Sequence, residues 1–322
     1  MAHYDVFNGD ADGICALHQL RLAQPCADAE LITGIKREIA LLKRVQAVAG
    51  DIVTVLDISL DSNRADLERL LHAGAQVLYF DHHYAGDTLF AHPNFNGRID
   101  TSSLVCTSLL VDVWLHGAHR LWAVTAAFGD NLHASARRAA EGLGLSETEL
   151  TALQTLGECL NYNGYGEQLA DLWFHPAELY RAVQPYADPR AFMAEAPAYQ
   201  KLHSGYLADL DAAEHQTALL ENESVAAFQL PDAPWARRVS GILANRLAHA
   251  HPTRAHAVLT PVADARYTVS VRAPLSHPAG ADALCRQFPN GGGRSAAAGI
   301  NGLPESDVPQ FLQAFAAQFR RQ

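Results

Sequence analysis

The sequence predicts an α/β protein: a mainly parallel, doubly wound sheet, then a helical linker and a smaller mixed α/β lobe. Three observations predict this fold class. Short apolar runs alternate with segments of helical periodicity over the first hundred residues, which is typical of right-handed βαβ crossovers. The chain then becomes mostly helical, and strand-like runs return after residue 220. We expect a first domain over 1–190, a linker over 191–219 and a second domain over 220–322.

The elements of the first part follow from hydrophobic periodicity and capping residues. Glycine and proline residues divide 162–197 into short helices. Strands are expected at His3–Phe7, Ala29–Thr33, Asp51–Asp57 and Gln76–Phe80. Helices are expected at Ile14–Ala23, Glu38–Ala49, Ser62–Ala73 with Ser62 as N-cap, Leu104–Trp114, Leu121–His133, after Ser146 with Glu149 completing a capping box, and over Tyr199–Leu219.

The second part mixes strands and helices around a glycine-rich turn at 290–295. Strands are expected at Ser224–Leu230, Ala255–Pro261 and Arg266–Arg272, and helices at Ala236–Ala250, Asp282–Phe288 and Val308–Arg320.

Composition narrows the function classes. The chain is 49% hydrophobic and carries a net charge of −11, which argues against a protein that coats duplex DNA. No apolar run reaches the roughly 20 residues of a membrane helix, and the N-terminus lacks a signal-peptide pattern, so we expect a cytoplasmic protein without a membrane partner. The charge is uneven: about −14 before residue 221 and about +3 after it. An acidic first part suits cation binding, and a basic second part suits an anionic substrate.

Acidic and imidazole side chains follow three of the predicted strands. Asp10 and Asp12 come after the first strand, Asp57 ends the third, and Asp81, His82 and His83 follow the fourth. Ligands of open parallel sheets bind beyond the carboxyl ends of the strands, so we expect these side chains to share one crevice. Carboxylates clustered with imidazoles and without thiolates favour manganese, magnesium or iron, and two such ions are a common device for phosphoryl chemistry.

Four ordered segments of the chain resemble the motifs of the DHH phosphoesterases. They are 8–13 (Asn-Gly-Asp-Ala-Asp-Gly), Asp57, 81–83 (Asp-His-His) and 129–130 (Gly-Asp). The late stretch 291–299 resembles the glycine motif of the DHH-associated C-terminal domain, and Arg272 resembles the arginine of one of its strands. The resemblance covers nearly the whole chain.

This resemblance implies a role for each motif residue. Asp10 and Asp12 would each ligate one of two Mn²⁺ ions, with Mg²⁺ or another divalent metal as the alternative, and Asp57 would bridge them. His82 and Asp130 would complete the second ion's shell. The predicted catalytic residues are His83, which would contact the scissile phosphate, and Asp81, which would orient an imidazole.

Two positions depart from the family pattern. Many members carry a histidine four residues before the first motif aspartate, where this chain has Val6, so Asn8 or a water would serve instead. The exonuclease branch also lacks that histidine. The glycine motif often carries a histidine where this chain has Arg294, whose guanidinium suits phosphate. The predicted substrate-binding residues are Asn8, Arg272, Gly291, Gly292, Gly293, Arg294 and Ser295.

The resulting prediction is a metal-dependent phosphohydrolase. Its expected partner is a small nucleotide or short single-stranded oligonucleotide, such as nanoRNA or 3′-phosphoadenosine 5′-phosphate, and a homodimer is compatible with the sequence. Three alternatives stay open: a cyclic nucleotide or cyclic dinucleotide phosphodiesterase, an inorganic pyrophosphatase, and a non-catalytic nucleotide-binding module. The pyrophosphatase is disfavoured because the chain lacks the basic Ser-Arg-Lys-Lys type of motif that such relatives carry.

Overall fold

The computed structural model describes residues 1–88 and 90–320. The chain divides into two compact units, Met1–Ser204 and Gly205–Gln322. Helix α9 (Pro197–Glu214) contains the division. None of the described helices is long and apolar enough to cross a membrane.

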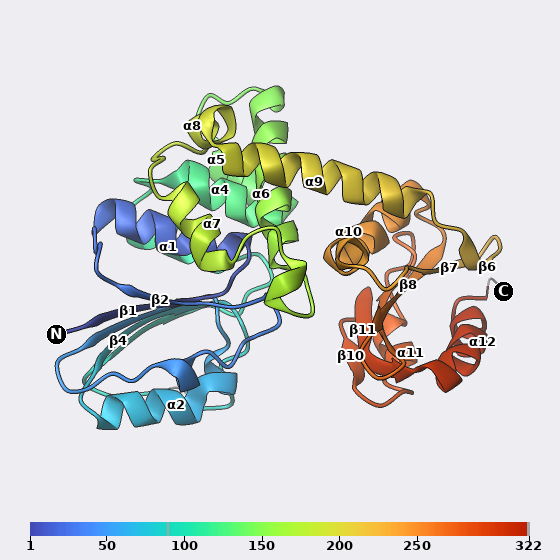
Figure 1. Ribbon diagram of the computed structural model, residues 1–322, viewed down its shortest axis with the longest axis horizontal. Helices are drawn as coiled ribbons and strands as arrows, with labels where there is room; N and C mark the ends of the chain where they lie inside the picture. The colour runs from blue at the N-terminus through green and yellow to red at the C-terminus, as the bar shows by residue number, and fades with distance from the viewer. Residues whose placement is uncertain (89, 321–322) are drawn as a thin grey trace. The chain divides into compact units, whose positions relative to one another are not determined.

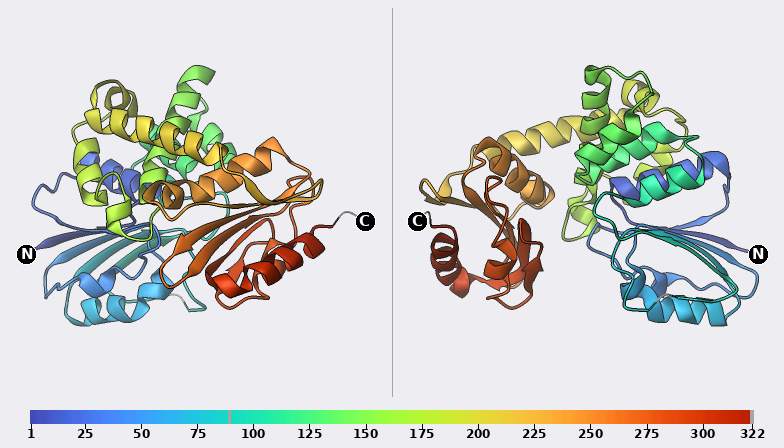
Figure 2. Two further views of the ribbon diagram at one scale, coloured as in Figure 1. Left: turned by 45° about the vertical axis from the view of Figure 1, so that its right-hand side comes forward. Right: turned by 180° about the vertical axis from the view of Figure 1, so that it is seen from behind.

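The first unit is built on a parallel sheet with strand order β2-β1-β3-β4-β5. Its strands are β1 (His3–Phe7), β2 (Glu30–Ile32), β3 (Ile52–Leu56), β4 (Gln76–Asp81) and β5 (Phe95–Ile99). Helices cover both faces of the sheet. Helix α2 (Leu60–His72) lies on one face, and α1 (Ala11–Ala23) with the helices that pack on it lies on the other (Figure 1 and Figure 2). The predicted doubly wound parallel sheet is confirmed.

Helices that follow the sheet strands complete the first unit. They are α3 (Thr107–Trp114), α4 (Arg120–Gly129), α5 (His133–Ala140), α6 (Glu147–Gly164), the 3₁₀ turn η2 (Leu169–Asp171), α7 (Pro176–Val183) and α8 (Pro189–Glu195). The predicted capping box opens α6, with Ser146 and Glu149 each accepting a backbone N–H of the other. Helix α4 packs between α1 and α6, which places the end of α6 near the start of α1.

In the first unit two local predictions were wrong, and one strand was not predicted. The stretch 38–49 was predicted as a helix but forms only a 3₁₀ turn, η1 (Leu42–Arg44). Side chains of α2 make hydrogen bonds to backbone groups that a helix would pair internally. Asn63 bonds the Leu42 N–H at 3.1 Å and the Ile39 carbonyl at 2.7 Å, and Arg69 donates to two more carbonyls there. The N-cap of α2 is Ser59 rather than Ser62. Strand β5 was not predicted, because its sequence (Phe-Asn-Gly-Arg-Ile) is polar and contains glycine.

The second unit is a mixed sheet with strand order β10-β11-β9-β8-β7-β6, in which only the β7–β8 pair of the described strands is parallel. Its elements are β6 (Ala218–Glu221), β7 (Val225–Gln229), α10 (Pro234–Ala250), β8 (Ala255–Val262), β9 (Arg266–Arg272), α11 (Ala281–Cys285), β10 (Gly291–Gly293), β11 (Ala297–Pro304), η3 (Glu305–Asp307) and α12 (Val308–Gln318). An apolar core lies between the sheet and the helices α11 and α12. The predicted mixed α/β lobe is confirmed.

Two predictions for the second unit need correction. The helix expected to reach Leu219 ends at Glu214, and β6 begins at Ala218. The glycine-rich segment is a hairpin rather than a turn alone: Gly291–Gly293 forms a strand that pairs antiparallel with 298–300. Among its three glycines only Gly293 has a left-handed backbone, at φ +138°.

Candidate metal centre

The three predicted strand ends lie side by side in the first unit. Strand β1 pairs with β3, and β3 pairs with β4, so that Phe7, Leu56 and Phe80 share one register. Because the strands are parallel, the residues that follow them meet at one edge of the sheet. The structure therefore brings the polar residues that follow β1, β3 and β4 together.

The start of α1 fixes the first two carboxylates. Asp10 caps the helix, and its Oδ1 accepts the backbone N–H groups of Asp12 and Gly13 at 3.0 and 3.1 Å. Gly9 allows the tight passage from strand to helix, since a Cβ there would lie 2.0 Å from the Gly34 carbonyl oxygen. Asp12 is 1% exposed and lies one residue inside the helix.

The start of α3 holds Asp12 in place, a feature that the sequence analysis missed. The backbone N–H groups of Thr107 and Ser108 donate to its two carboxylate oxygens, each at 2.7 Å. The Thr107 hydroxyl donates to Asp57 Oδ1 at 3.1 Å. Free N–H groups at a helix start stabilise a carboxylate. The only local signal was a Thr-Ser pair in the first turn of a predicted helix.

His82 is the centre of the donor cluster. Its Nδ1 lies 3.0 Å from the Val105 carbonyl oxygen, which can only accept, so Nδ1 carries the proton and Nε2 is left as a ligand atom. Nε2 lies 3.4 Å from a carboxylate oxygen of Asp57, 3.8 Å from one of Asp130 and 3.9 Å from one of Asp12. One nitrogen and three oxygens at such separations are the spacing expected of ligands around one divalent cation.

His83 is held by a fully buried carboxylate. Asp81 Oδ1 accepts from His83 Nδ1 at 2.7 Å and from its backbone N–H at 3.2 Å, and Oδ2 accepts the Leu60 N–H at 3.2 Å. Burial by itself lowers the pKa of His83, but the hydrogen bond and negative charge of Asp81 raise it above its usual value. The His83 side chain is 41% exposed, so its ring is accessible from solvent.

The electrostatics of the cluster favour a bound cation. Burial, and then the charges of Asp12, Asp10 and Asp130, raise the pKa of Asp57 well above its ordinary value. Burial also raises the pKa of Asp130, although the nearby Lys36 lowers it. Asp57 further adopts a left-handed backbone at φ +61°, a strained conformation that is common at functional sites. Repulsion among buried carboxylates is relieved when a metal binds them, so the residues present fit a divalent ion.

Donor atoms suited to a metal fall into two groups of three among the described residues. Asp12, His82 and Asp130 form one, and Asp57, His82 and His83 form the other, with the ligand atoms of each within 4.8 Å of one another. Asp10 belongs to neither group.

Asn8, which was predicted to bind substrate, is 6% exposed. Its Nδ2 donates to the Lys36 carbonyl at 3.4 Å, and its Oδ1 has no partner in the described part of the chain.

Sequence analysis also missed Lys36, which reaches into the cluster from the loop after β2. Its ammonium bonds Asp10 Oδ2 at 2.5 Å and lies 3.7 Å from Asp130 Oδ1. Burial by itself raises the pKa of Asp10, but the charge of Lys36 lowers it below its usual value. Conversely, burial lowers the pKa of Lys36 and the charge of Asp10 outweighs that effect, so the ammonium stays protonated. No strand end or spacing pattern marks this residue in the sequence.

The predicted substrate-binding residues of the second unit gather at one end of its sheet. Arg272 ends β9 opposite Ala297 of β11, and its Nε donates to Asn245 Oδ1 of α10 at 2.6 Å. Arg294 and Ser295 lie at the exposed tip of the β10–β11 hairpin, where Arg294 and Ala297 exchange backbone hydrogen bonds. Two guanidinium groups therefore lie on neighbouring segments beside the strand Gly291–Gly293.

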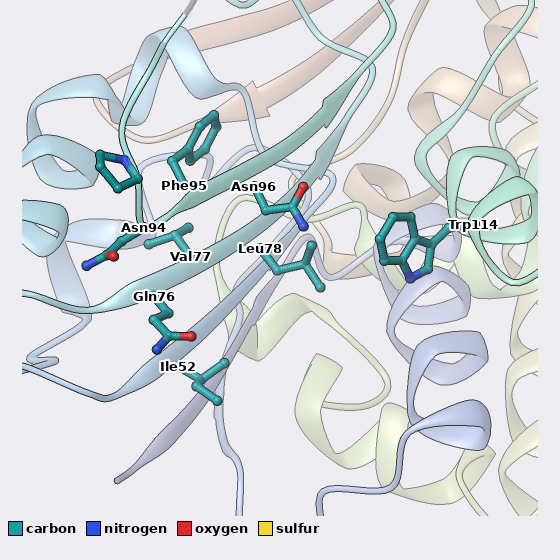
Figure 3. Close-up of a pocket in the computed structure, with 9 residues that line it drawn as sticks. Ile52, Gln76, Val77, Leu78, Asn94, Phe95, Asn96 and Trp114 are labelled. Carbon is teal, nitrogen blue, oxygen red and sulfur yellow. The ribbon is translucent and has the colours of Figure 1, made fainter.

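A pocket elsewhere in the first unit is unrelated to this cluster. Figure 3 shows it lined by Ile52, Gln76, Leu78, Asn94 and Trp114, among others. Ile52 and Gln76 are the first residues of β3 and β4, whereas the metal-type donors follow the last residues of those strands. The pocket thus lies toward the amino ends of the strands.

No protein-family model and no curated protein sequence matches the chain. Solved structures do. A structure of the exonuclease RecJ bound to manganese is 17% identical over 100% of this chain and 91% of that one, with a TM-score of 0.64. RecJ of Thermus thermophilus in complex with Mn²⁺ is 19% identical, with a TM-score of 0.62; the match covers 98% of this chain but only 51% of that one. PggH of Vibrio cholerae, a pGpG-specific phosphodiesterase, is 14% identical over 99% of each chain, with a TM-score of 0.58.

These likenesses concern the fold. They extend over both units, because each match covers 98% or more of this chain. The chain therefore has the two-lobe fold that its resemblance to the DHH phosphoesterases implied.

Proposed function

We propose that this protein, which shares its two-lobe fold with RecJ and PggH, is a divalent-metal-dependent phosphohydrolase that cleaves phosphoester bonds in small nucleotides or short oligonucleotides. One observation carries the proposal. His82 presents Nε2, with its other nitrogen hydrogen-bonded, to carboxylate oxygens of Asp12, Asp57 and Asp130 at 3.4 to 3.9 Å. A nitrogen with three carboxylate oxygens within 3.9 Å of it is a donor set that suits Mn²⁺ or Mg²⁺.

Some residues of the cluster would bind the metal, and others would contact the substrate. The metal ligands would be Asp12, Asp57, His82 and Asp130. When bound, the metal supplies a water-derived nucleophile and neutralises phosphate charge. The start of α3 keeps the carboxylate of Asp12 in place, and the Val105 carbonyl fixes the ring of His82. These supporting bonds fix the ligand atoms of Asp12 and His82 before any substrate arrives.

His83 is the residue suited to the substrate. Its Nδ1 proton is held by Asp81, which leaves Nε2 as the atom free to address a phosphate oxygen. The raised pKa keeps the ring protonated to higher pH, so Nε2–H donates a charge-assisted hydrogen bond to the oxygen that gains charge in the transition state. In the second unit, Arg272 and Arg294 carry guanidinium groups whose geometry suits a phosphate.

Among small substrates, a linear dinucleotide is favoured. PggH is a pGpG-specific phosphodiesterase, and the match covers 99% of its chain. The acidic net charge of −11 also suits a short substrate better than a long polyanion. Cyclic dinucleotides and cyclic mononucleotides are the second candidates, because the same metal chemistry would cleave their phosphodiester bonds.

The test is an activity panel with Mn²⁺ and with Mg²⁺. Its substrates are a 5′-phosphorylated dinucleotide, 3′-phosphoadenosine 5′-phosphate, cyclic mono- and dinucleotides, and pyrophosphate. We expect turnover of the linear dinucleotide, its loss in Asp57→Asn, and wild-type rates in Asp28→Asn, a matched change of an exposed carboxylate. No turnover of any substrate by metal-loaded protein contradicts the proposal and favours a binding module, and turnover of pyrophosphate alone excludes a nucleotide substrate.

A further inference from the structure

The ammonium group of Lys36 lies inside the carboxylate cluster. Its Nζ lies 2.5 Å from Asp10 Oδ2, 2.9 Å from Asn161 Oδ1 and 3.7 Å from Asp130 Oδ1. An ammonium group has three N–H donors and no acceptor; two of them bond Asp10 and Asn161, and the positive charge forms an ion pair with Asp130. The Lys36 side chain is 25% exposed, and a freely solvated surface lysine would be far more exposed.

The backbone and ring contacts of Lys36 fix it in this position. Its N–H donates to the Gly164 carbonyl at 2.9 Å, and its own carbonyl accepts from Asn8 Nδ2 at 3.4 Å. The ammonium also lies 5.5 Å from the centre of the Tyr165 ring, a cation–π distance. The loop after β2 is therefore tied both to the end of α6 and to the end of β1.

Lys36 uses the carboxylate that the first of two metal ions would need. Asp10 Oδ1 accepts two backbone N–H groups of α1, and Oδ2 faces the ammonium. Asp10 is accordingly absent from both groups of metal-type donors found in the described residues. At the position where many relatives are expected to carry a histidine for this ion, Val6 is fully buried in the apolar core and has no ligand atom.

The second ion's ligands remain complete. Asp12, His82 and Asp130 form a donor group without Asp10, and a carboxylate oxygen of Asp57 lies 3.4 Å from His82 Nε2. A divalent ion added beside Asp10 would share an oxygen with the ammonium and lie close to its positive charge, which is strongly unfavourable in a buried site.

We propose that the Lys36 ammonium takes the place of one of the two metal ions, so that the protein holds a single divalent cation on Asp12, Asp57, His82 and Asp130. The inference rests on the proposed function, because it assumes that these four residues bind a metal. It makes Asp10 a partner of Lys36 rather than a metal ligand. A fixed ammonium neutralises and hydrogen-bonds an anion as an ion does, but chelators cannot remove it.

The test counts ions rather than activity. Wild type, Lys36→Met and Lys43→Met are saturated with Mn²⁺, freed of excess metal, and measured by elemental analysis and electron paramagnetic resonance. Lys43 is an exposed lysine of the same unit and serves as the matched control. We expect one ion per chain with a mononuclear six-line spectrum in wild type and in Lys43→Met. We expect close to two ions, with a spin-coupled spectrum, in Lys36→Met, where Asp10 is released.

Each outcome decides a different claim. Two ions per wild-type chain overturn this inference and leave the proposed function intact, whereas no bound ion in wild type overturns both. A single ion in a folded Lys36→Met protein shows that the ammonium does not exclude the second ion, which also overturns the inference. If Lys36→Met does not fold, Lys36→Gln takes its place in the ion count, because it keeps N–H donors and removes the charge. The ion count of wild type also tests the inference by itself.

Discussion

Replacing Asp81 with asparagine should uncouple His83 from its anchor without disturbing the metal ligands. Asp81 accepts three hydrogen bonds, two from His83 and one from Leu60. An amide offers one acceptor oxygen in place of two, so one N–H of the site faces the asparagine NH₂ group. A hydrogen bond to a charged group contributes about 1.5–3 kcal/mol, which corresponds to roughly a 10- to 100-fold fall in kcat if the bond acts in the transition state.

The pH dependence gives this prediction a sign. The Asp81 carboxylate raises the pKa of His83, so the protonated ring persists to higher pH than an ordinary histidine. If protonated His83 serves the phosphate, activity falls on the alkaline side as pH rises through that raised pKa. In Asp81→Asn the pKa drops, and the alkaline limb of the pH–rate profile moves to lower pH.

Two measurements check the change. The pKa of His83 is followed by NMR of the histidine rings in Mg²⁺, which is diamagnetic, and its resonance is assigned by its absence in His83→Gln. Bound metal is measured in parallel and should equal that of wild type, because His82 is anchored by Val105 rather than by Asp81. If the pKa of His83 shifts but the pH–rate profile does not, His83 does not have the proposed role. If Asp81→Asn binds less metal than wild type, Asp81 does support the metal ligands, contrary to this prediction.

Three further predictions concern the metal ligands, the second unit and its stability. His82→Ala should lower Mn²⁺ affinity by more than about 100-fold in equilibrium dialysis, since it removes the nitrogen among three carboxylates; unchanged affinity would place the ion elsewhere. Arg294→Ala should raise KM with little change in kcat, because an exposed hairpin tip provides remote binding, and an unchanged KM would remove Arg294 from the substrate site. Burial, and then the charges of His251 and Arg254, lower the pKa of His256 to about 4, so wild type should lose about 3 kcal/mol of stability as pH falls from 6.5 to 4. His256→Leu should largely remove this loss when urea unfolding is compared at pH 6.5 and pH 4, and an equal loss in both proteins would show that His256 is not its source.

The fold class could be predicted because its signals are local. Apolar runs such as Ile52–Leu56 mark buried parallel strands, and the polar residue that ends each run marks the carboxyl edge of the sheet. The same logic predicts that Asp57 and His82 meet at one edge of the sheet. Prediction failed over 38–49, where buried apolar residues have helical spacing but Asn63 and Arg69 of a neighbouring helix satisfy the backbone. Local periodicity does not reveal which partner bonds a backbone group.

The number of metal ions is a second property of the site that local sequence signals do not reveal. A list of carboxylates and imidazoles in the sequence counts ligands, but the number of ions depends on which carboxylates are already neutralised. That depends on Lys36, whose position is set by Asn161 and Gly164 at the end of a helix more than a hundred residues later. Val6 signals that one ligand is missing, yet it does not say whether water, Asn8 or a side-chain cation replaces the ion it served. Because an ammonium and a metal ion satisfy the same carboxylate, only the three-dimensional neighbours of Asp10 distinguish a one-ion site from a two-ion site.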